Sequence, residues 1–278
     1  MTNLPINLIV NADDYGYYPC VSRGIRQAVT QGRVTATGII ANAPNLNEQI
    51  ERLAGHKDLD VGIHLNLTSR RPLSFKMEEK LNQWEGQFPS AYAMAGEILS
   101  GRIGLDRVFM EWSAQVETLL GLGLQLQFIN SHEHIHMLPS LYKLAMELAD
   151  EYQIPHIRLT RAEWMSPLSF ASLLRNTPLQ MMEWMNVKSK LANTPHFIGL
   201  NCSGKLNLTY LKKRLSSLKP GLSYELMCHP GQFDPVEITD SRLLAYHAWE
   251  SELKLLTSDE FITLLDDYNI RLVNYRAL

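Results

Sequence analysis

Short apolar runs alternate with helical patterns along most of this 278-residue chain. Runs such as residues 6–10 are rich in β-branched side chains and too short for a helix, so each predicts a buried strand. The segments between them space their apolar residues three and four apart, as amphipathic helices do. This order predicts a parallel sheet with helices outside it. Seven or eight mostly parallel strands over this length favour a (β/α) barrel formed as a single domain, residues 1–278.

The pattern predicts the elements individually. Strands are expected at residues 6–10, 36–40, 60–67, 124–129, 156–159, 196–200, 222–228 and 271–275. Helices are expected at residues 21–31, 46–53, 105–120, 140–152, 207–218, 240–255 and 258–268. Segments 70–104 and 161–195 do not fit this alternation and are predicted to be loops over the mouth of the barrel. Their Trp84, Trp164 and Trp184 could line a sugar-binding surface or simply pack against helices.

Composition and charge exclude several classes of protein. A formal net charge of −3 gives no electrostatic reason to expect nucleic acid or an anionic membrane as a partner. No stretch approaches the apolar length of a membrane span, and the first residues lack the basic start of a signal peptide. Three cysteines without C-x-x-C spacing argue against a disulfide framework or a thiolate zinc site. We therefore expect a cytoplasmic enzyme, with a homodimer as the default assembly.

The sequence Asn11-Ala12-Asp13-Asp14 directly follows the first predicted strand. Two adjacent carboxylates at the end of a buried strand repel each other and are poorly solvated, so they need a cation or a proton-transfer role. The carboxyl ends of strands are where α/β folds place their chemistry. The pattern therefore predicts one aspartate on a metal and its neighbour handling protons. The alternative is a turn in which an aspartate caps the following helix.

Three later strands also deliver a histidine at or near their ends. His64 shares a strand face with Asn66, His132 opens the run Ser-His-Glu-His-Ile-His, and His229 precedes Pro-Gly. A single histidine on an apolar face is usually a hydrogen-bonded core residue. Four strands that each end in aspartate or histidine are hard to explain by packing alone, so the pattern favours a metal site.

These motifs resemble those of the YdjC-like carbohydrate deacetylases, the ChbG/HpnK family. The four motifs, which span residues 11–230 in the order of the family, are Asn11-Ala12-Asp13-Asp14, Gly62-x-His64-x-Asn66, Ser131-His132-x-His134-x-His136 and Glu225-x-Met227-Cys228-His229-Pro230. The resemblance implies a distorted (β/α) barrel related to polysaccharide deacetylases. It also implies a divalent metal and the removal of acetyl groups from N-acetylated sugars or oligosaccharides.

The resemblance also implies roles for individual residues. Asp14, His64 and His132 would bind the metal, Asp13 would be the general base, and His229 the general acid. Two positions depart from the family pattern. Asn130 stands where members often carry aspartate, and Glu133 stands where histidine also occurs.

The chemistry of amide hydrolysis agrees with this assignment. An amide is a poor electrophile, so its carbonyl must be polarised and a water must become nucleophilic near neutral pH. A divalent metal held by two histidines and one carboxylate leaves coordination positions open for both tasks. Two imidazoles favour zinc by ligand softness, whereas descriptions of the family name magnesium, so either Mg or Zn is expected.

The sequence leaves the roles of the later histidines open. In an extended segment His132, His134 and His136 share a face, whereas in a helical turn His132 and His136 are neighbours. His132 is the preferred ligand, with His136 as a reserve ligand or substrate contact, and His134 is expected to support the ligands. The histidines without such context, expected to be structural or exposed, are His56, His156, His196 and His247.

Two further residues are candidates for contacts around the metal. Arg158 lies on a short predicted strand and could hold a substrate oxygen, orient Asp13, or form only a surface ion pair. Asn66 lies on the strand face of His64 and could contact substrate or support that ligand.

Two other functions fit parts of the pattern. One is a different metal-dependent barrel hydrolase, a phosphoesterase or an amidohydrolase. Phosphoesterases tend to carry His-x-His on the first strand, where this chain has paired aspartates. The other is a non-catalytic glycan-binding protein, which would be expected to have lost a ligand or the base. The chain keeps the proposed base, acid and ligands, so the sequence favours the deacetylase.

Overall fold

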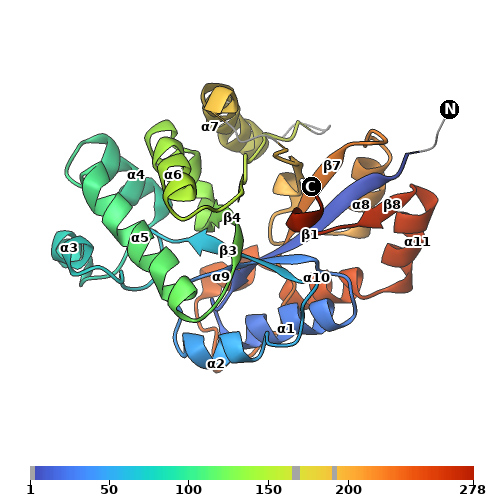
Figure 1. Ribbon diagram of the computed structural model, residues 1–278, viewed down its shortest axis with the longest axis horizontal. Coiled ribbons are helices and arrows are strands. Elements are labelled where there is room, and N and C mark those ends of the chain that lie inside the picture. Colours follow the sequence, from blue (N-terminus) through green and yellow to red (C-terminus); the bar gives the residue numbers. More distant parts are fainter. Residues whose placement is uncertain (1–3, 165–169, 190–192) are drawn as a thin grey trace.

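The computed structural model of the protein describes residues 4–164, 170–189 and 193–278. At its centre is one sheet of eight strands, and every pair of neighbouring strands is parallel. The strands are β1 (Ile6–Tyr15), β2 (Ala36–Ile39), β3 (Asp60–Leu65), β4 (Leu126–Ser131), β5 (His156–Ile157), β6 (His196–Ile198), β7 (Ser223–Cys228) and β8 (Ile270–Leu272). The paired order is β5-β4-β3-β2-β1-β7-β6, with β8 also on β1, so the sheet curls into an incompletely closed barrel (Figure 1). The predicted distorted α/β barrel is confirmed.

Helices surround this sheet (Figure 1). They are α1 (Pro19–Thr30), α2 (Leu46–Glu51), α3 (Phe75–Glu78), α4 (Ala91–Leu99), α5 (Leu105–Gly121), α6 (Pro139–Glu151), α7 (Phe170–Asn186), α8 (Leu208–Leu215), α9 (Ser241–Tyr246), α10 (Trp249–Leu256) and α11 (Asp259–Asp267). Short 3-10 helices occupy Glu79–Trp84, His132–Met137, Val187–Ser189, Leu200–Cys202 and Tyr275–Ala277. Among the described residues, none of these helices is both long and apolar enough to span a membrane.

Three expectations about the elements need correction. The first strand does not stop at residue 10 but continues to Tyr15, so the paired aspartates belong to β1 itself. The helix expected at 240–255 is divided into α9 and α10. Segments 70–104 and 161–195 carry helices, namely α3, α4 and α7, although residues 165–169 and 190–192 lie outside the described residues.

Strand β1 pairs with three other strands of the sheet. On one edge it pairs with β7 from Asn7 to Ala12. The other edge is shared, because β8 pairs with Ile6–Leu8 and β2 with the stretch from Asn11 to Tyr15. Because all these strands are parallel, the carboxyl ends of β1, β3, β4 and β7 meet at one end of the barrel.

The inner face of the barrel changes from apolar to polar toward that end. Alternation along β1 sends Leu8, Val10 and Ala12 into the large core beneath the helices. Ile9 belongs instead to a small separate cluster with Ala36, Phe128 and Tyr275. The rings of Phe128 and Tyr275 stack with centroids 4.4 Å apart, which closes the lower interior with apolar side chains. Asn11 and Asp13 follow Ile9 on the same inner face.

Gly62 allows β3 to lie tightly against β4 beside this cluster. A Cβ atom there would lie 2.5 Å from the carbonyl oxygen of Phe128 and 2.6 Å from its ring. We expect Gly62→Ala to lower the free energy of unfolding by about 1–3 kcal/mol, the usual cost of overpacking a core, as measured by urea denaturation.

Gly96, on an exposed position of α4, provides the matched control. A Cβ atom there would meet nothing within 4 Å. Gly96→Ala should therefore be neutral or raise stability by about 0.5–1 kcal/mol through helix propensity. Equal effects of the two substitutions would contradict the role assigned to Gly62.

Candidate functional site

Three buried side chains meet at the carboxyl ends of β1, β3 and β4. One ligand atom from each of Asp14, His64 and His132 can be chosen so that all three lie within 4.8 Å of one another. Oδ1 of Asp14 lies 3.2 Å from Nε2 of His64 and 2.8 Å from Nδ1 of His132. One carboxylate and two imidazoles form a donor set that suits a divalent cation. The structure thus brings together the three residues predicted to bind the metal.

The local backbone conformation orients the side chains of Asp14 and His132. Asp14 has a φ of 69°, a left-handed conformation that is rare outside glycine and costs about 1–3 kcal/mol. After His132, Glu133 and His134 also have positive φ values, 51° and 55°, so the chain turns sharply. This turn separates His132 from the histidines that follow it, which neither an extended segment nor a regular helical turn would do.

The charges of these groups stabilise one another. Burial alone would raise the pKa of Asp14, but the neighbouring His132 and His64 hold it well below its usual range. Burial alone would lower the pKa of His132, but the Asp14 carboxylate outweighs that effect and raises it. The carboxylate is therefore ionised and already directed at both imidazoles, which is the state in which a divalent cation could replace the shared protons.

Asp13 points to the inner face of the sheet and forms an ion pair with Arg158. Nη1 of Arg158 lies 2.6 Å from Oδ2 of Asp13, and Nη2 lies 2.9 Å from Oδ1. Asn130 donates a further hydrogen bond of 2.9 Å to Oδ1. Burial alone would raise the pKa of Asp13, but the charge of Arg158 outweighs it and lowers the pKa to about 2. Asp13 is therefore an ionised carboxylate in a fixed orientation.

Arg158 is itself held from several sides. Its Nε donates 2.7 Å to Glu225 on β7, and its guanidinium lies 5.2 Å from the ring centre of Phe197. Its side chain is fully buried, so the alternative of a surface ion pair is wrong. Of the remaining alternatives, the geometry favours the orientation of Asp13.

His136 lies behind this ion pair. Its Nε2 lies 3.0 Å from the carbonyl oxygen of Arg158, and its Nδ1 lies 2.6 Å from Oγ of Ser131. Burial lowers the pKa of His136 to about 3, so the ring is neutral and donates one hydrogen bond while accepting the other. With both nitrogens engaged, His136 is placed to hold the backbone of Arg158 rather than to contact a metal or a substrate.

His229 follows β7 and reaches the site from the opposite side. Its backbone N–H donates 2.6 Å to Oε2 of Glu252, a fully buried residue of α10. Its Nδ1 is buried and has no hydrogen-bond partner among the described residues. Its positive form would stabilise the Asp13 carboxylate, since it is among the charges that lower the pKa of Asp13. This is the environment expected for a group that exchanges a proton with a ligand.

Sequence reasoning missed two residues around His229. The ring of His247 lies 5.2 Å from that of His229 and stacks on Trp249 at 4.7 Å, although its sequence context gave no reason to place it near the site. Glu252 was also missed. An available signal was its position in α10, where it falls among the buried residues Trp249, Leu253 and Leu256.

Asn66 shapes the loop after β3. Its Oδ1 accepts hydrogen bonds from the backbone of Thr68 and Ser69, at 3.0 and 3.2 Å. Its Nδ2 donates to Oδ1 of Asn42 and to the carbonyl oxygen of Ser69, at 2.9 and 2.8 Å. The whole amide is occupied, so the geometry favours a supporting role over a substrate contact.

The tryptophans proposed as a sugar-binding surface differ in exposure. Trp84 packs against the main core. Trp164 and Trp184 are 45% and 71% exposed, and Trp164 donates a hydrogen bond to Gln180 of α7. Contact of these side chains with a sugar stays a prediction.

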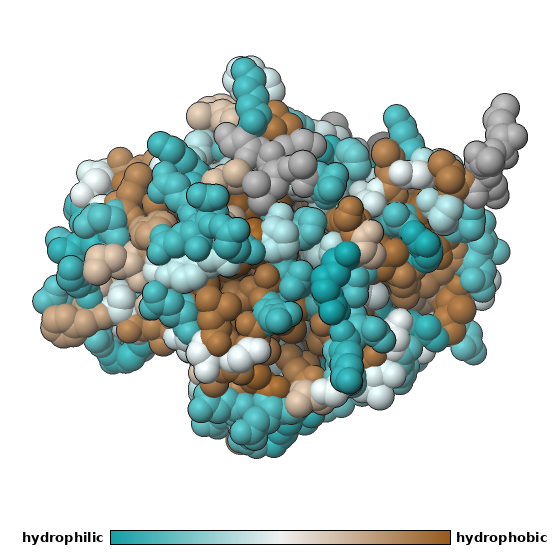
Figure 2. Space-filling model, viewed as in Figure 1, coloured by the Kyte–Doolittle hydropathy of each residue, from teal (hydrophilic) through white to brown (hydrophobic). Residues whose placement is uncertain are grey.

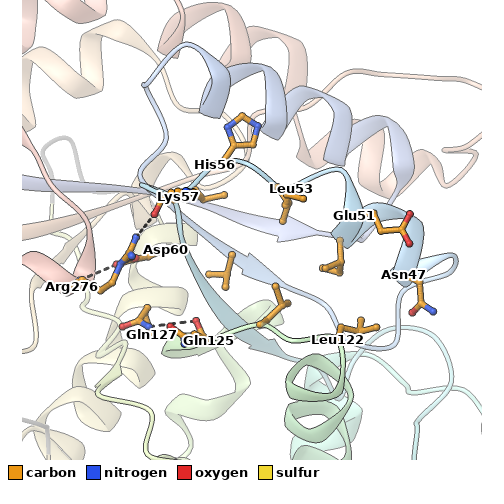
Figure 3. Close-up of a pocket in the computed structure, with 15 residues that line it drawn as sticks. Asn47, Glu51, Leu53, His56, Lys57, Asp60, Leu122, Gln125, Gln127 and Arg276 are labelled. Carbon is orange, nitrogen blue, oxygen red and sulfur yellow. Dashed lines mark hydrogen bonds and ion pairs between the residues drawn. The ribbon is translucent and has the colours of Figure 1, made fainter.

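A cavity of about 540 Å³ lies at the other end of the sheet, between α2, the start of β3 and the end of α5 (Figure 3). Leu53 and Leu122 line it together with polar residues at its rim, and Figure 2 shows hydrophobic surface over this part of the molecule. Its buried carboxylate, Asp60, already accepts hydrogen bonds from Arg276. This cavity is remote from the carboxyl ends of the strands and lacks their metal-ligating groups.

Comparison with known proteins extends these observations. The family described as YdjC-like protein matches residues 7–267. A protein of Clostridium beijerinckii named carbohydrate deacetylase is 28% identical over 98% of this chain and 100% of its own length. One of the same name from Vibrio cholerae serotype O1 is 30% identical over 98% of this chain and 96% of its own length. A crystal structure from Enterococcus faecalis V583, provisionally described as a cellobiose-phosphate cleavage protein, is 25% identical with a TM-score of 0.77 and 98% coverage of both chains.

The low pKa of Asp13 predicts how acid affects stability. Because its pKa of about 2 in the folded protein lies below the ordinary value of 3.8, the ionised carboxylate stabilises the fold at neutral pH. That stabilisation, about 2 kcal/mol, is lost as the pH falls through these two values, about half of it by about pH 3. Asp13→Asn should therefore reduce the loss of stability between about pH 6 and about pH 3 by about 1 kcal/mol.

Urea unfolding of the metal-free protein at the two pH values measures this difference. Asp267→Asn, at an exposed position of α11, is the control and should lose as much stability as the wild type. If Asp13→Asn also lost as much as the wild type, the ion pair would not have the strength assigned to it.

Proposed function

The chain belongs to the YdjC-like protein family, and from this premise we propose that it hydrolyses the N-acetyl group of an N-acetylated sugar or oligosaccharide with a divalent metal. Relatives that match along nearly their full length carry the name carbohydrate deacetylase. The observation that carries the proposal is the cluster of Asp14, His64 and His132 with the separately anchored Asp13 beside it.

Asp14, His64 and His132 would hold the metal. A divalent cation there would polarise the amide carbonyl and lower the pKa of the attacking water. Two imidazoles among three protein ligands favour zinc, and magnesium is the second candidate. The burial of all three side chains keeps water from competing with these donors, which strengthens their attraction for a cation.

Asp13 would act as the general base. Its ion pair with Arg158 keeps the carboxylate ionised and oriented before any substrate arrives, so no reorganisation is needed when it accepts a proton from water. Arg158 would act through Asp13 as a positioning residue, and Glu225 would hold Arg158 in turn.

His229 would act as the general acid. Its Nδ1 has no partner in the part of the chain that the structure describes, so no hydrogen bond from those residues competes for this ring nitrogen. Glu252 fixes its backbone, and the neighbouring His247 limits where the ring can turn. Protonated His229 could therefore deliver its proton to the departing amine, whose release completes the cleavage of the C–N bond.

Acetate release from N,N'-diacetylchitobiose tests the proposal directly. We expect release with added zinc or magnesium, and its loss when EDTA removes the metal. Asp13→Asn and His229→Ala should each lower kcat by about 10²–10⁴-fold, because each removes one proton-transfer group.

His56→Ala is the matched control, since His56 lines the cavity at the opposite end of the sheet and should retain full activity. Metal binding, followed separately by calorimetry, should persist in His229→Ala. Bound metal without acetate release from this sugar or its longer oligomers would contradict the deacetylase and favour another hydrolase or a glycan-binding protein.

A further inference from the structure

Asn130 lies between His64, a proposed metal ligand, and Asp13, the proposed general base. In the register of β3 and β4 it lies directly opposite His64. Its Oδ1 lies 2.7 Å from Nδ1 of His64, and its Nδ2 lies 2.9 Å from Oδ1 of Asp13. All three side chains are at most 2% exposed, so water does not compete for these hydrogen bonds.

The donors and acceptors in this chain allow only one arrangement. A carboxylate such as Asp13 only accepts hydrogen bonds, so Asn130 must turn its NH₂ group toward it. The amide oxygen then faces His64, and Nδ1 of His64 must carry the proton that this oxygen accepts. In the neutral ring of His64 the lone pair is consequently on Nε2, the nitrogen that lies 3.2 Å from Asp14 and that binds a metal once it no longer shares a proton with this carboxylate.

We propose that Asn130 is a positioning residue that couples the metal ligand to the base: by donating to Asp13 and accepting from His64, one amide fixes the base and selects the imidazole tautomer that can bind metal. The roles that it couples rest on the proposed function. The effect on His64 does not depend on the substrate, because it concerns metal binding alone.

Gly38 provides the space for this arrangement. A Cβ atom there would lie 3.0 Å from Oδ1 of Asn130 and 3.1 Å from Nδ1 of His64, at the hydrogen bond itself. Strand β2 therefore has no side chain on its inner face at the point where Asn130 and His64 meet.

Aspartate at position 130 could form only one of these two hydrogen bonds, the one with His64. A carboxylate at residue 130 would accept the hydrogen bond from His64, but it has no proton to donate to Asp13 and would add a like charge beside it. Leucine, which has the same branched shape but larger methyl groups, would do neither and would leave Nδ1–H of His64 without an acceptor. The two substitutions therefore separate the two contacts.

The experiment measures zinc affinity by calorimetry and, independently, kcat and KM for acetate release. Asn130→Leu should lose about 10–100-fold in zinc affinity, the usual effect of removing a group that orients a metal-binding histidine. Asn130→Asp should keep zinc affinity within roughly threefold of the wild type but lose about tenfold or more in kcat, with KM little changed. A purely structural role would move both quantities together.

Asn11→Leu is the matched control, because Asn11 donates hydrogen bonds to Asp13 and Glu225 but forms none with His64. Its zinc affinity should equal that of the wild type. Gly38→Ala, which crowds the hydrogen bond without removing a polar group, should weaken zinc binding by roughly 3–10-fold and gives a second test if Asn130→Leu fails to fold.

Two results would overturn the proposal. Wild-type zinc affinity in folded Asn130→Leu, or in Gly38→Ala if Asn130→Leu does not fold, would show that His64 needs no help from Asn130. Full kcat in Asn130→Asp would show that Asp13 does not depend on its donor. If the wild type released no acetate but the zinc affinities followed this order, the deacetylase would fail while the tautomer selection stood.

Discussion

The buried ion pair between Arg158 and Asp13 is the interaction on which the rest of the site depends. On the inner face of the sheet, the carboxylates of Asp13 and Glu225 both contact this one guanidinium, so a single positive charge meets two negative charges. Removing one partner from such a pair would leave an uncompensated buried charge, which typically costs about 3–5 kcal/mol. Asp14 has no share in this ion pair, because its carboxylate pairs with His64 and His132, and these three side chains offer a divalent cation a place beside it.

The parallel sheet makes this concentration of charge possible. Its lower interior is filled by the apolar cluster that includes Phe128 and Tyr275, so the barrel is closed beneath the polar groups. Above it, β1, β3, β4 and β7 each turn a polar side chain inward at the same end. The buried polar groups there come from several strands, and the register of the strands brings donors opposite acceptors. Arg158 illustrates this, because it joins β1 to β7 from a position just beyond β5.

Much of this could be predicted from the sequence. Short β-branched runs with helical spacing between them give the alternation of strands and helices, since both periods are local properties of the chain. The convergence of Asp14, His64 and His132 followed from their places at strand ends, because parallel strands share one carboxyl edge. Their roles as ligands, like those of Asp13 and His229 as base and acid, remain proposals.

What the sequence could not predict depends on contacts between distant segments. The positive φ values after His132 redirect the chain, so His136 binds the backbone of Arg158 instead of sharing a face with His132. His247 reaches His229 only because the predicted helix at 240–255 is broken between α9 and α10. Asn130 was recognised as a departure from the family, but its two hydrogen bonds depend on the register between β3 and β4.

Crystals grown with zinc would reveal where the protein binds the metal, since anomalous diffraction at the zinc absorption edge locates the ion. We expect one strong peak bounded by Asp14, His64 and His132, with ligand distances of about 2.0–2.2 Å and Asp13 still paired with Arg158. A strong peak elsewhere, for example between His229 and His247, with none at the three predicted ligands would contradict this expectation.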